Sequence, residues 1–488
     1  MRNKLRFVHR GEIVELENID PTETLLNYLR YDRALTGTKE GCAEGDCGAC
    51  SVVLGDLHDG GLRYQAVNAC IQFLPMLDGK EIITVEDLKA SDGTLHPVQE
   101  ALVAANGTQC GFCTPGFVMS IFAEMHTGRT PDRGHIDNIL AGNLCRCTGY
   151  GPLIQAAQDI ARADLRDQFH DRASATTALL QTLQKDESLS LTGADRHYFA
   201  PKTTDELAGL LERFPEATIL AGATDVGLWV TKQHRDLPCV IHISQIAELR
   251  QISEEKNQLS IGAGVSYSEA WSQLAGYYPD FGELIRRLAS TQIRNSGTIG
   301  GNIANGSPIG DTPPALIALG ARLRLRSATG TRDIALEDFF ITYGQQDLRP
   351  EEFVEKLFVP LPDGNSRFAA YKLSKRFDQD ISAACAAFRL TLDGSRVKDI
   401  RICYGGMAGT PARAHQTEKA LIGTEWSVAS IEAALPMMAE DYQPMSDMRA
   451  SKEYRLMSAQ NLLKKFAIET TTPGVATRIV GAGGLAYA

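Results

Sequence analysis

Eight of the eleven cysteines lie before residue 150, in two groups whose spacing suits metal or redox chemistry. The first group reads C-x4-C-x2-C with a fourth cysteine farther along, and the second reads C-x2-C, thirty-one residues, then C-x-C. The members are Cys42, Cys47, Cys50 and Cys70, followed by Cys110, Cys113, Cys145 and Cys147. The other three, Cys239, Cys385 and Cys403, stand singly among apolar neighbours, which favours small buried hydrophobes.

The spacing of the first group is typical of a plant-type [2Fe–2S] cluster. One short loop must wrap a cluster and direct three sulfurs inward, and the loop contains Gly41, Gly45 and Gly48. We expect these glycines to adopt positive φ and to let backbone N–H groups reach the sulfurs. A four-cysteine zinc site is the alternative, but zinc sites usually pair two C-x2-C knuckles, so the x4 gap favours the cluster.

The elements around this loop are predicted from periodicity. Residues 4–17 alternate apolar and polar types about a turn at 10–11, which indicates a hairpin. Residues 22–35 have helical spacing, with Thr22 or Thr24 as the candidate cap. Two short strands, 50–54 and 64–71, are predicted after the cysteine loop. This order of elements is that of a ferredoxin-type domain.

The second group lies beside two predicted helices, 115–125 and 152–163, which open with Pro115 and Pro152. Helix N-termini stabilise thiolates. By spacing alone a zinc site stays open here. Beside a ferredoxin-like domain, a second [2Fe–2S] cluster is favoured.

The length, net charge and cysteine count limit the classes to which the protein can belong. A chain of 488 residues exceeds one hydrophobic core, so two to four domains are expected. The net charge is −11 and no Lys/Arg-rich run is present, which argues against nucleic acid and against an anionic membrane surface. The N-terminus has no apolar secretory segment and no run is long enough to span a bilayer, so we expect a cytoplasmic protein. An odd cysteine count also disfavours a disulfide framework.

Several glycine-rich stretches follow residue 197. Residues 218–230 predict a strand, a turn and a helix, whose loop could place N–H groups against a pyrophosphate, although this signal alone is weak. A Rossmann site at LSIGAGVSYSEA is rejected because Tyr267 stands where the third glycine belongs. The C-terminal IVGAGGLAYA is predicted to be a tail.

The strongest of these stretches is 295–321, which has five glycines before Asp311 and then a helix. We expect a loop that cradles phosphates and a ribityl chain. An ordinary irregular loop is the alternative, disfavoured because this much glycine costs backbone entropy that a ligand would offset.

Together, LTGTKEGCAEGDCGAC, QCGFCTPGF, GNLCRCTGY, LAGATDVG and IGGNIANGSPIGD resemble the molybdenum hydroxylases, the xanthine dehydrogenase and aldehyde oxidase family. The resemblance implies that the first cysteine group holds the cluster nearer the flavin and the second the cluster nearer the molybdenum. It also implies that Gln109 hydrogen-bonds the molybdopterin and that Cys147 lies close to it.

The same resemblance implies an FAD site of non-Rossmann type. The pyrophosphate would be held by Leu220, Ala221, Gly222, Ala223, Thr224, Asp225 and Val226. The flavin would be lined by Thr298, Gly301, Asn302, Asn305, Ser307 and Asp311. Residues 371–388 resemble the segment beside the isoalloxazine, with Lys372 and Asp380 as candidate contacts. From the residues alone, KLSKRFDQD suits a solvated charged loop equally well.

We therefore expect a multidomain α+β protein. Its predicted parts are a plant-type ferredoxin β-grasp domain (1–90), a helical [2Fe–2S] domain (91–163), a linker (164–196), an α+β FAD-binding domain (197–370) and a small C-terminal α+β domain (371–488).

The resemblance is to the family's bacterial xanthine dehydrogenases, in which the molybdopterin-binding domain is a separate large subunit. It implies an electron-transfer subunit in an α2β2 heterotetramer, carrying two [2Fe–2S] clusters and FAD and reducing NAD⁺, with no substrate-site catalytic residue of its own. Alternatives are a hydroxylase of aldehydes or N-heterocycles, a stand-alone NADH-dependent flavin–iron–sulfur reductase, and a zinc-binding interaction protein.

Overall fold

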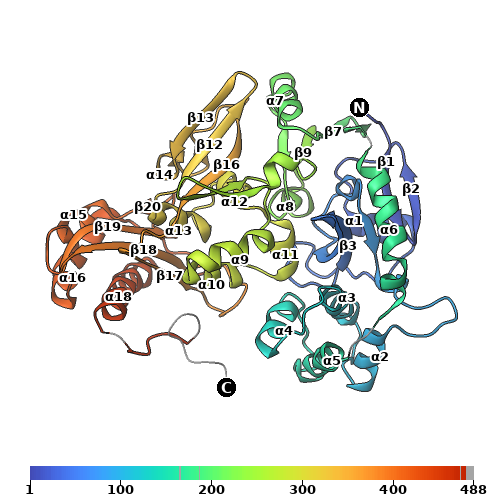
Figure 1. Ribbon diagram of the computed structural model, residues 1–488, viewed down its shortest axis with the longest axis horizontal. Helices are drawn as coiled ribbons and strands as arrows, with labels where there is room; N and C mark the ends of the chain where they lie inside the picture. Colours follow the sequence, from blue (N-terminus) through green and yellow to red (C-terminus); the bar gives the residue numbers. More distant parts are fainter. Residues whose placement is uncertain (164–165, 186, 473, 480–488) are drawn as a thin grey trace. The chain divides into compact units, whose positions relative to one another are not determined.

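The computed structural model divides into two compact units (Figure 1). Unit 1 and unit 2 are each built around their own buried apolar residues. Unit 1 comprises Met1–Ile246 and Ser290–Gly297, and unit 2 comprises Ala247–Ala289 and the chain from Thr298. The described residues are 1–163, 166–185, 187–472 and 474–479. The predicted tail lies outside them except for Ile479. Within the described ranges, no helix is both long and apolar enough to cross a membrane.

Unit 1 begins with a five-stranded mixed sheet in the order β2-β1-β5-β3-β4. The predicted hairpin is confirmed, with His9 paired to Glu12 across the turn. The predicted helix is short and continues as a π-helical turn, Tyr28–Asp32, and Thr24 caps it by accepting the Asn27 N–H at 3.2 Å. The elements are β1 (Leu5–His9), β2 (Glu12–Leu16), α1 (Leu25–Asn27), β3 (Ser51–His58), β4 (Gly61–Asn68) and β5 (Glu81–Ile83).

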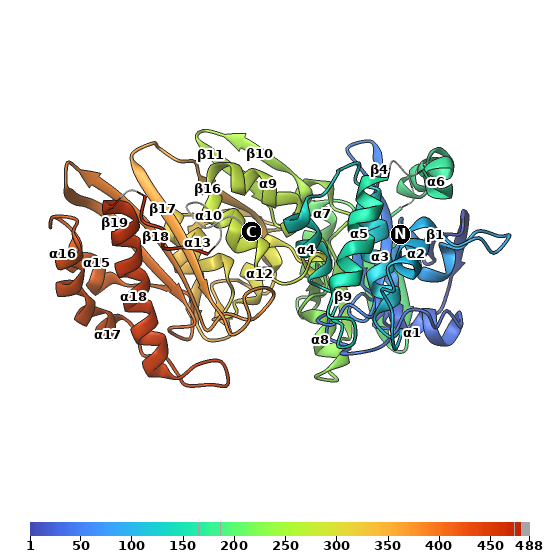
Figure 2. The same cartoon turned by 90° about the horizontal axis from the view of Figure 1, so that it is seen from below.

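Four helices follow, and Figure 2 shows them gathered together. Both prolines predicted to open helices lie in the first turns of α3 and α5. Phe117, Phe122 and Leu153 fill the core between the helices. The elements are α2 (Pro97–Ala104), α3 (Thr114–Met125), α4 (Arg133–Leu140) and α5 (Gly151–Arg162).

The segment 164–196, expected to be a linker with some helical character, contains the seventeen-residue helix α6 (Gln168–Gln184). Leu180 and Leu183 of α6 pack with Val8 of β1, and Phe169 enters the core of the helical domain. These apolar residues recur at helical spacing, so the helix buries one face although its composition is polar. The segment is therefore docked structure over most of its described length.

The rest of unit 1 is a four-stranded sheet in the order β6-β7-β9-β8, in which β7, β9 and β8 run parallel. The predicted strand, turn and helix at 218–230 are confirmed as β8 and α8. The elements are β6 (Leu189–Gly193), β7 (Arg196–Ala200), α7 (Thr204–Arg213), β8 (Thr218–Leu220), α8 (Val226–Thr231), β9 (Cys239–His242) and α11 (Thr291–Ser296).

Unit 2 contains an antiparallel sheet in the order β10-β11-β16-β12-β13, packed against helices. The expectation of one glycine-rich loop over 295–311 is wrong in part, because α12 occupies its middle. Ile299 and Ile303 of α12 are buried, and a Cβ on Gly300 would lie 2.4 Å from the Ala263 Cβ. The glycine thus lets a helix pack closely. The elements are β10 (Ile252–Glu255), β11 (Gln258–Gly262), α9 (Tyr267–Tyr277), α10 (Pro279–Arg286), α12 (Ile299–Asn305), α13 (Thr312–Leu319), β12 (Arg322–Ser327), β13 (Gly330–Ala335), α14 (Leu336–Phe339), β14 (Phe340–Thr342), β15 (Gln345–Gln346) and β16 (Phe353–Pro360).

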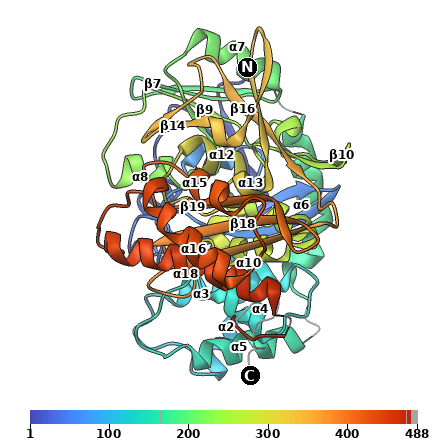
Figure 3. The same cartoon turned by 90° about the vertical axis from the view of Figure 1, so that its left-hand side faces the viewer.

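The C-terminal part of unit 2 is a four-stranded antiparallel sheet in the order β17-β18-β19-β20. Figure 3 shows α15, α16 and α18 lying against one face of this sheet. Phe388 of β18 and Phe466 of α18 pack against each other in the core between them, with ring centroids 5.2 Å apart. The elements are β17 (Ser366–Leu373), β18 (Ala384–Asp393), β19 (Arg396–Gly405), β20 (Ala412–Arg413), α15 (His415–Leu421), α16 (Val428–Ala434), α17 (Met438–Asp441) and α18 (Lys452–Thr471).

Candidate functional site

The first four thiols meet where the 41–50 loop passes the end of β4. The backbone N–H groups of Asp46 and Cys47 point at the Cys42 Sγ, each with N···S of 3.3 Å, and the Cys42 N–H points at the Cys47 Sγ at 3.4 Å. Asn68 Nδ2 donates to the Gly45 carbonyl at 2.8 Å and fixes the loop against β4. Such N–H groups stabilise thiolates and tune a bound cluster.

The glycines of this loop have two separate roles. Gly45 and Gly48 have φ of +80° and +68°, as predicted. The same prediction for Gly41 is wrong, because its φ lies outside that region. Gly41 provides space instead, since a Cβ there would lie 2.7 Å from the Cys47 Sγ.

The sulfurs of the first group interact strongly with one another. The Cys42 and Cys50 thiols raise the pKa of Cys70, and burial adds to the effect. Cys42 likewise raises the pKa of Cys47, whereas hydrogen bonds from Cys47 and Cys70 lower the pKa of Cys42. One thiolate therefore disfavours ionisation of its neighbours. Bound iron would remove this conflict by supplying positive charge at the centre of the group.

The second four thiols meet beside the N-termini of α3 and α5. Cys113 is the residue before α3, and the Cys145 N–H donates to the Tyr150 hydroxyl at 2.9 Å. Burial and the nearby Cys145 and Cys110 thiols raise the pKa of Cys113 to about 12. The Cys110 thiol raises the pKa of Cys147. The four positions are thus linked pairwise, as a second cluster requires.

One side of the second group is open to solvent. Cys110 and Cys147 are exposed, and so is Gln109. Two large apolar side chains lie nearby, Phe112 at 47% exposure and Leu144 at 38%. An exposed apolar rim around two cysteines suits a surface that another protein part covers.

The loops of the two cysteine groups touch each other directly. The Leu144 N–H donates to the Cys47 carbonyl at 2.9 Å, and Asn143 Nδ2 donates to the Gly48 carbonyl at 3.0 Å. Gln292 Nε2 of α11 supports this junction by donating to Asn143 Oδ1 at 3.1 Å. Asn143 and Gln292 are each 1% exposed. Neither amide is indicated by a pattern in the sequence, and no spacing links position 292 to the cysteines.

The predicted pyrophosphate residues form one loop of unit 1, from the end of β8 to the start of α8. This loop packs against the segment that follows Cys70. Gln72 Nε2 donates to the Gly222 carbonyl at 3.1 Å and to Ser296 Oγ at 3.3 Å. A Cβ on Gly222 would lie 1.8 Å from the Ser296 carbonyl oxygen, so only glycine fits here. Ala223 has φ of +62°, which turns the chain from strand to helix.

The predicted flavin residues of unit 2 cluster around α12 and the start of α13. Thr298 caps α12 by accepting the Gly301 N–H at 3.0 Å, and Asn302 Oδ1 accepts from Thr312 Oγ1 at 2.7 Å. Asn305 lies exposed at the end of α12. Ser307 Oγ follows and accepts the Ile309 N–H at 3.4 Å. Hydroxyl and amide groups thus gather along a short stretch, where several of them bond backbone or side-chain groups of the same segment.

The two candidate contacts of the isoalloxazine segment are separated. Lys372 is buried in β17, where its Nζ pairs with Asp311 Oδ2, and Ser382 Oγ donates to the other carboxylate oxygen. Asp380 lies instead in the partly exposed loop after β17 and accepts the Arg376 N–H at 2.8 Å. KLSKRFDQD is therefore a buried strand end followed by a solvated loop. Lys372 orders Asp311, while Asp380 orders its own loop.

The single cysteines behave as expected in two cases. Cys385 and Cys403 are buried in β18 and β19, and Cys239 is half-buried at the start of β9.

The donor sets of the two larger groups, four convergent thiols each, fit [2Fe–2S] clusters. The residue assignments of the clusters and of FAD remain predictions.

Four family models match the chain. They are described as a 2Fe-2S iron-sulfur cluster binding domain over 7–73, a [2Fe-2S] binding domain over 84–158, an FAD binding domain in molybdopterin dehydrogenase over 191–362, and a CO dehydrogenase flavoprotein C-terminal domain over 369–470. Together they favour iron–sulfur clusters over the zinc sites that spacing left open.

The chain is similar to Xanthine dehydrogenase 2 of Arabidopsis thaliana, at 32% identity over 86% of this chain and 36% of that protein. It is also similar to Aldehyde oxidase 2 of Macaca fascicularis, at 29% identity over 96% of this chain and 39% of that protein. The chain thus spans little more than a third of the length of these relatives.

Among solved structures, a chain of carbon monoxide dehydrogenase from Hydrogenophaga pseudoflava matches with a TM-score of 0.53 and 30% identity. The match covers 55% of this chain and 94% of that one. The four family models and this structural match together establish two [2Fe–2S] domains, followed by an FAD-binding domain and a C-terminal flavoprotein domain. The chain belongs to the molybdenum hydroxylase family and carries the iron–sulfur and FAD-binding part of such an enzyme.

Proposed function

We propose that this chain is the electron-transfer subunit of a xanthine dehydrogenase. A partner subunit that binds molybdopterin hydroxylates hypoxanthine or xanthine with water, which releases two electrons and two protons per turnover. This chain conducts the electrons to FAD, and NAD⁺ leaves as NADH. When bound, the clusters supply one-electron transfer, and the flavin exchanges one-electron for two-electron chemistry.

The hydrogen-bonded path through unit 1 carries the proposal. The backbone runs from Cys145 to Leu144, whose N–H bonds the Cys47 carbonyl at 2.9 Å. From Cys70 the backbone runs to Gln72, whose amide bonds the Gly222 carbonyl at 3.1 Å. The second cysteine group, the first group and the predicted pyrophosphate loop are therefore joined in that order. The chain's own contribution is to hold these three sites in fixed succession.

The open face beside Gln109 supports a molybdopterin-binding partner. Phe112 and Leu144 supply apolar contact area there, and the exposed Cys110 and Cys147 place the second group at that surface. A solved carbon monoxide dehydrogenase chain is matched over 94% of its length by 55% of this chain, which supports an enzyme whose domains are divided among separate subunits. An α2β2 complex in the cytoplasm is part of the proposal.

An aldehyde-oxidising or N-heterocycle-oxidising enzyme is the second candidate. The similarity to Aldehyde oxidase 2 extends over 96% of the chain at 29% identity, nearly as high as the identity to xanthine dehydrogenases. The substrate pocket belongs to the partner in either case, so these residues serve both substrate classes equally.

The test uses the native complex, isolated from its host through a tag on this chain. Hypoxanthine with NAD⁺ should bleach the iron–sulfur and flavin absorbance anaerobically and then form NADH. Cys147→Ala should abolish bleaching of the flavin by hypoxanthine but keep bleaching by NADH, while the matched Cys403→Ala should keep both.

Each other outcome is decisive. Bleaching by an aldehyde and not by purines would replace the substrate assignment. Full turnover by the chain alone with NADH and a dye, with no partner recovered from the host, would favour the stand-alone reductase. Purine-driven flavin reduction at the normal rate in Cys147→Ala would refute the order of the path.

A further inference from the structure

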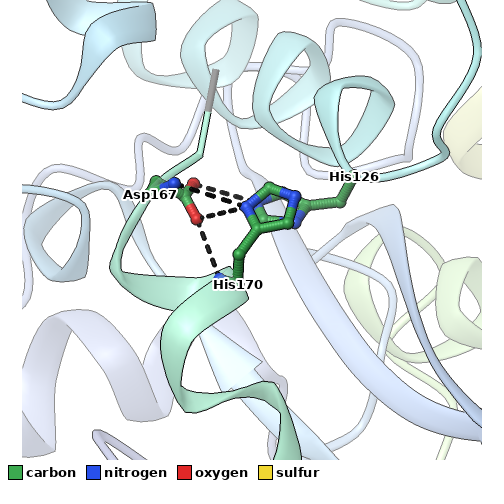
Figure 4. Close-up of side chains that lie close together, drawn as sticks. All are labelled: His126, Asp167 and His170. Carbon is green, nitrogen blue, oxygen red and sulfur yellow. Dashed lines mark hydrogen bonds and ion pairs between the residues drawn. The ribbon is translucent and has the colours of Figure 1, made fainter. Parts of the chain in front are cut away.

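Three imidazoles surround one carboxylate in unit 1, in a place that neither cysteine group uses. Asp167 caps the N-terminus of α6, and His170 lies in the first turn of that helix. His126 ends α3, and His96 caps α2. Figure 4 shows His126 and His170 turned toward the Asp167 carboxylate from two different helices. Three separate segments thus place four polar side chains at one point.

The group is compact and mostly buried. The His126 Nε2 lies 3.0 Å from Asp167 Oδ2, and the His170 Nδ1 lies 2.8 Å from Asp167 Oδ1. The two imidazole rings lie face to face with centroids 4.3 Å apart. The side chains of Asp167 and His126 are 3% and 5% exposed, whereas His170 is 31% exposed.

His96 occupies a supporting position. Its Nδ1 accepts the Val98 N–H at 3.2 Å, so its proton is on Nε2, which lies 2.7 Å from Asp167 Oδ2. Its tautomer is therefore fixed and its ring orients the carboxylate, as ligand-supporting groups do around protein-bound metals. This leaves two imidazoles and one carboxylate as donors.

Imidazole nitrogen and carboxylate oxygen are the donor types that transition metals take in proteins.

We propose that His126, Asp167 and His170 bind one divalent transition-metal ion, with Zn²⁺ as the best-fitting candidate. Their donor atoms lie within 4.8 Å of one another. A tetrahedral zinc with bonds of about 2.0–2.1 Å sets its ligand atoms about 3.3 Å apart, so one imidazole must turn out of the stacked pair for both rings to direct a nitrogen at the ion. Imidazole and carboxylate donors also fit cobalt and nickel. Zinc is the preferred candidate because it has no redox chemistry.

A cavity of about 590 Å³ reaches His170, one of the three proposed ligands. It is lined by apolar residues of α3, α4 and α5, among them Ile136 and Ile160, and by the charged side chains of Glu124, Arg129 and Arg162. A metal here would tie α6 to the end of α3, and so join the helical [2Fe–2S] domain to the helix that packs on β1. The role is structural, and it lies outside the electron path proposed above.

The test is metal analysis of the full-length holoprotein with four irons per chain, so that vacant cysteine sites do not take up zinc. After exposure to Zn²⁺ and desalting through a weak chelator, the protein should retain about one zinc per chain. His126→Gln and His170→Gln should lower retained zinc at least tenfold while iron and FAD stay unchanged. His135→Gln is the matched control, because His135 pairs with Glu124 in the same domain at 3.0 Å.

Zinc X-ray absorption provides a second measurement that holds even if a variant folds poorly. Scattering from N and O neighbours at about 2.0–2.1 Å without sulfur supports the site. Sulfur scattering at about 2.3 Å would assign the zinc to cysteines and overturn the proposal. It is also overturned if wild-type holoprotein retains no zinc, or if His170→Gln retains as much as wild type.

Discussion

Replacing Gly48 by alanine tests whether the two cluster loops touch as the structure has them. Gly48 has φ of +68°, and a Cβ there would lie 2.2 Å from the Gly142 carbonyl oxygen and 2.6 Å from Asn143 Nδ2. The first of these atoms is backbone, and the second belongs to a buried, hydrogen-bonded side chain. Neither can yield without separating the loops.

The expected cost follows from two contributions. A non-glycine residue at positive φ costs about 1–2 kcal/mol. Separating the loops also removes the hydrogen bonds from Asn143 to the Gly48 carbonyl and from Leu144 to the Cys47 carbonyl. Each contributes about 0.5–1.5 kcal/mol, so the total loss in the free energy of unfolding is about 2–5 kcal/mol.

Gly60→Ala is the matched control, because Gly60 has φ of +79° and nothing within 4 Å of its Cβ position. Gly60→Ala should therefore lose only the part of the free energy of unfolding that comes from placing a non-glycine residue at positive φ. For a unit of this size 1 kcal/mol corresponds to about 2–4 °C, so Gly48→Ala should melt about 2–12 °C below Gly60→Ala. Melting is followed by circular dichroism on holoprotein, with iron content and the EPR of both reduced clusters measured on the same samples.

Equal melting temperatures and identical EPR spectra for the two variants would refute the argument. The contact between Gly48 and Gly142 would then not exist as described. The Leu144–Cys47 hydrogen bond, which depends on the same approach of the two loops, would lose its support, and with it the path that carries the proposed function.

Two further predictions concern buried ionisable groups. Lys372→Met leaves the Asp311 carboxylate buried without its cation, so the free energy of unfolding should fall by about 3–5 kcal/mol and FAD per chain should drop, whereas Lys375→Met at an exposed position should change neither. Burial lowers the pKa of His242 to about 3, so its contribution is complete above the unfolded-state pKa of about 6.5 and is lost as the pH falls toward 3. The free energy of unfolding, measured with urea, should therefore fall between pH 7.5 and pH 5 by about 2 kcal/mol less in His242→Gln than in wild type. Equal falls in the two proteins would contradict this sign.

Local patterns in the sequence predicted the cysteine groups and the elements beside them. The C-x4-C-x2-C spacing, Pro115 and Pro152 each act within a few residues, so the loop and the helix starts they indicate are present. The linker prediction for 164–196 was the weaker one, because the average polarity of that segment hides the helical spacing of Phe169, Leu180 and Leu183. The packing partners of these residues, which lie far away in sequence, show that the segment is docked.

The stretch 295–311 shows how glycine can be misread. Its five glycines before Asp311 suggested a loop freed for a ligand, yet Ile299 and Ile303 stand four apart and bury one face of α12. Gly300 is needed here because Ala263 lies so close that a side chain would not fit. A glycine therefore reports either freedom or close approach, and only the packing partner, thirty-seven residues earlier in the chain, decides between them.

The connections between sites were the part that no local pattern could provide. Leu144 is adjacent to the predicted ligand Cys145 and Gln72 lies two residues after Cys70, but their partners Cys47 and Gly222 lie far from them in sequence. Each hydrogen bond uses a backbone carbonyl, which every residue type offers, so residue identity carries no trace of it. Sequence patterns therefore suggest a ligand for each site, whereas the order of the sites in the proposed electron path depends on folded contacts. This is why the Gly48 variant, which changes a contact and no ligand, is the more direct test of the relay.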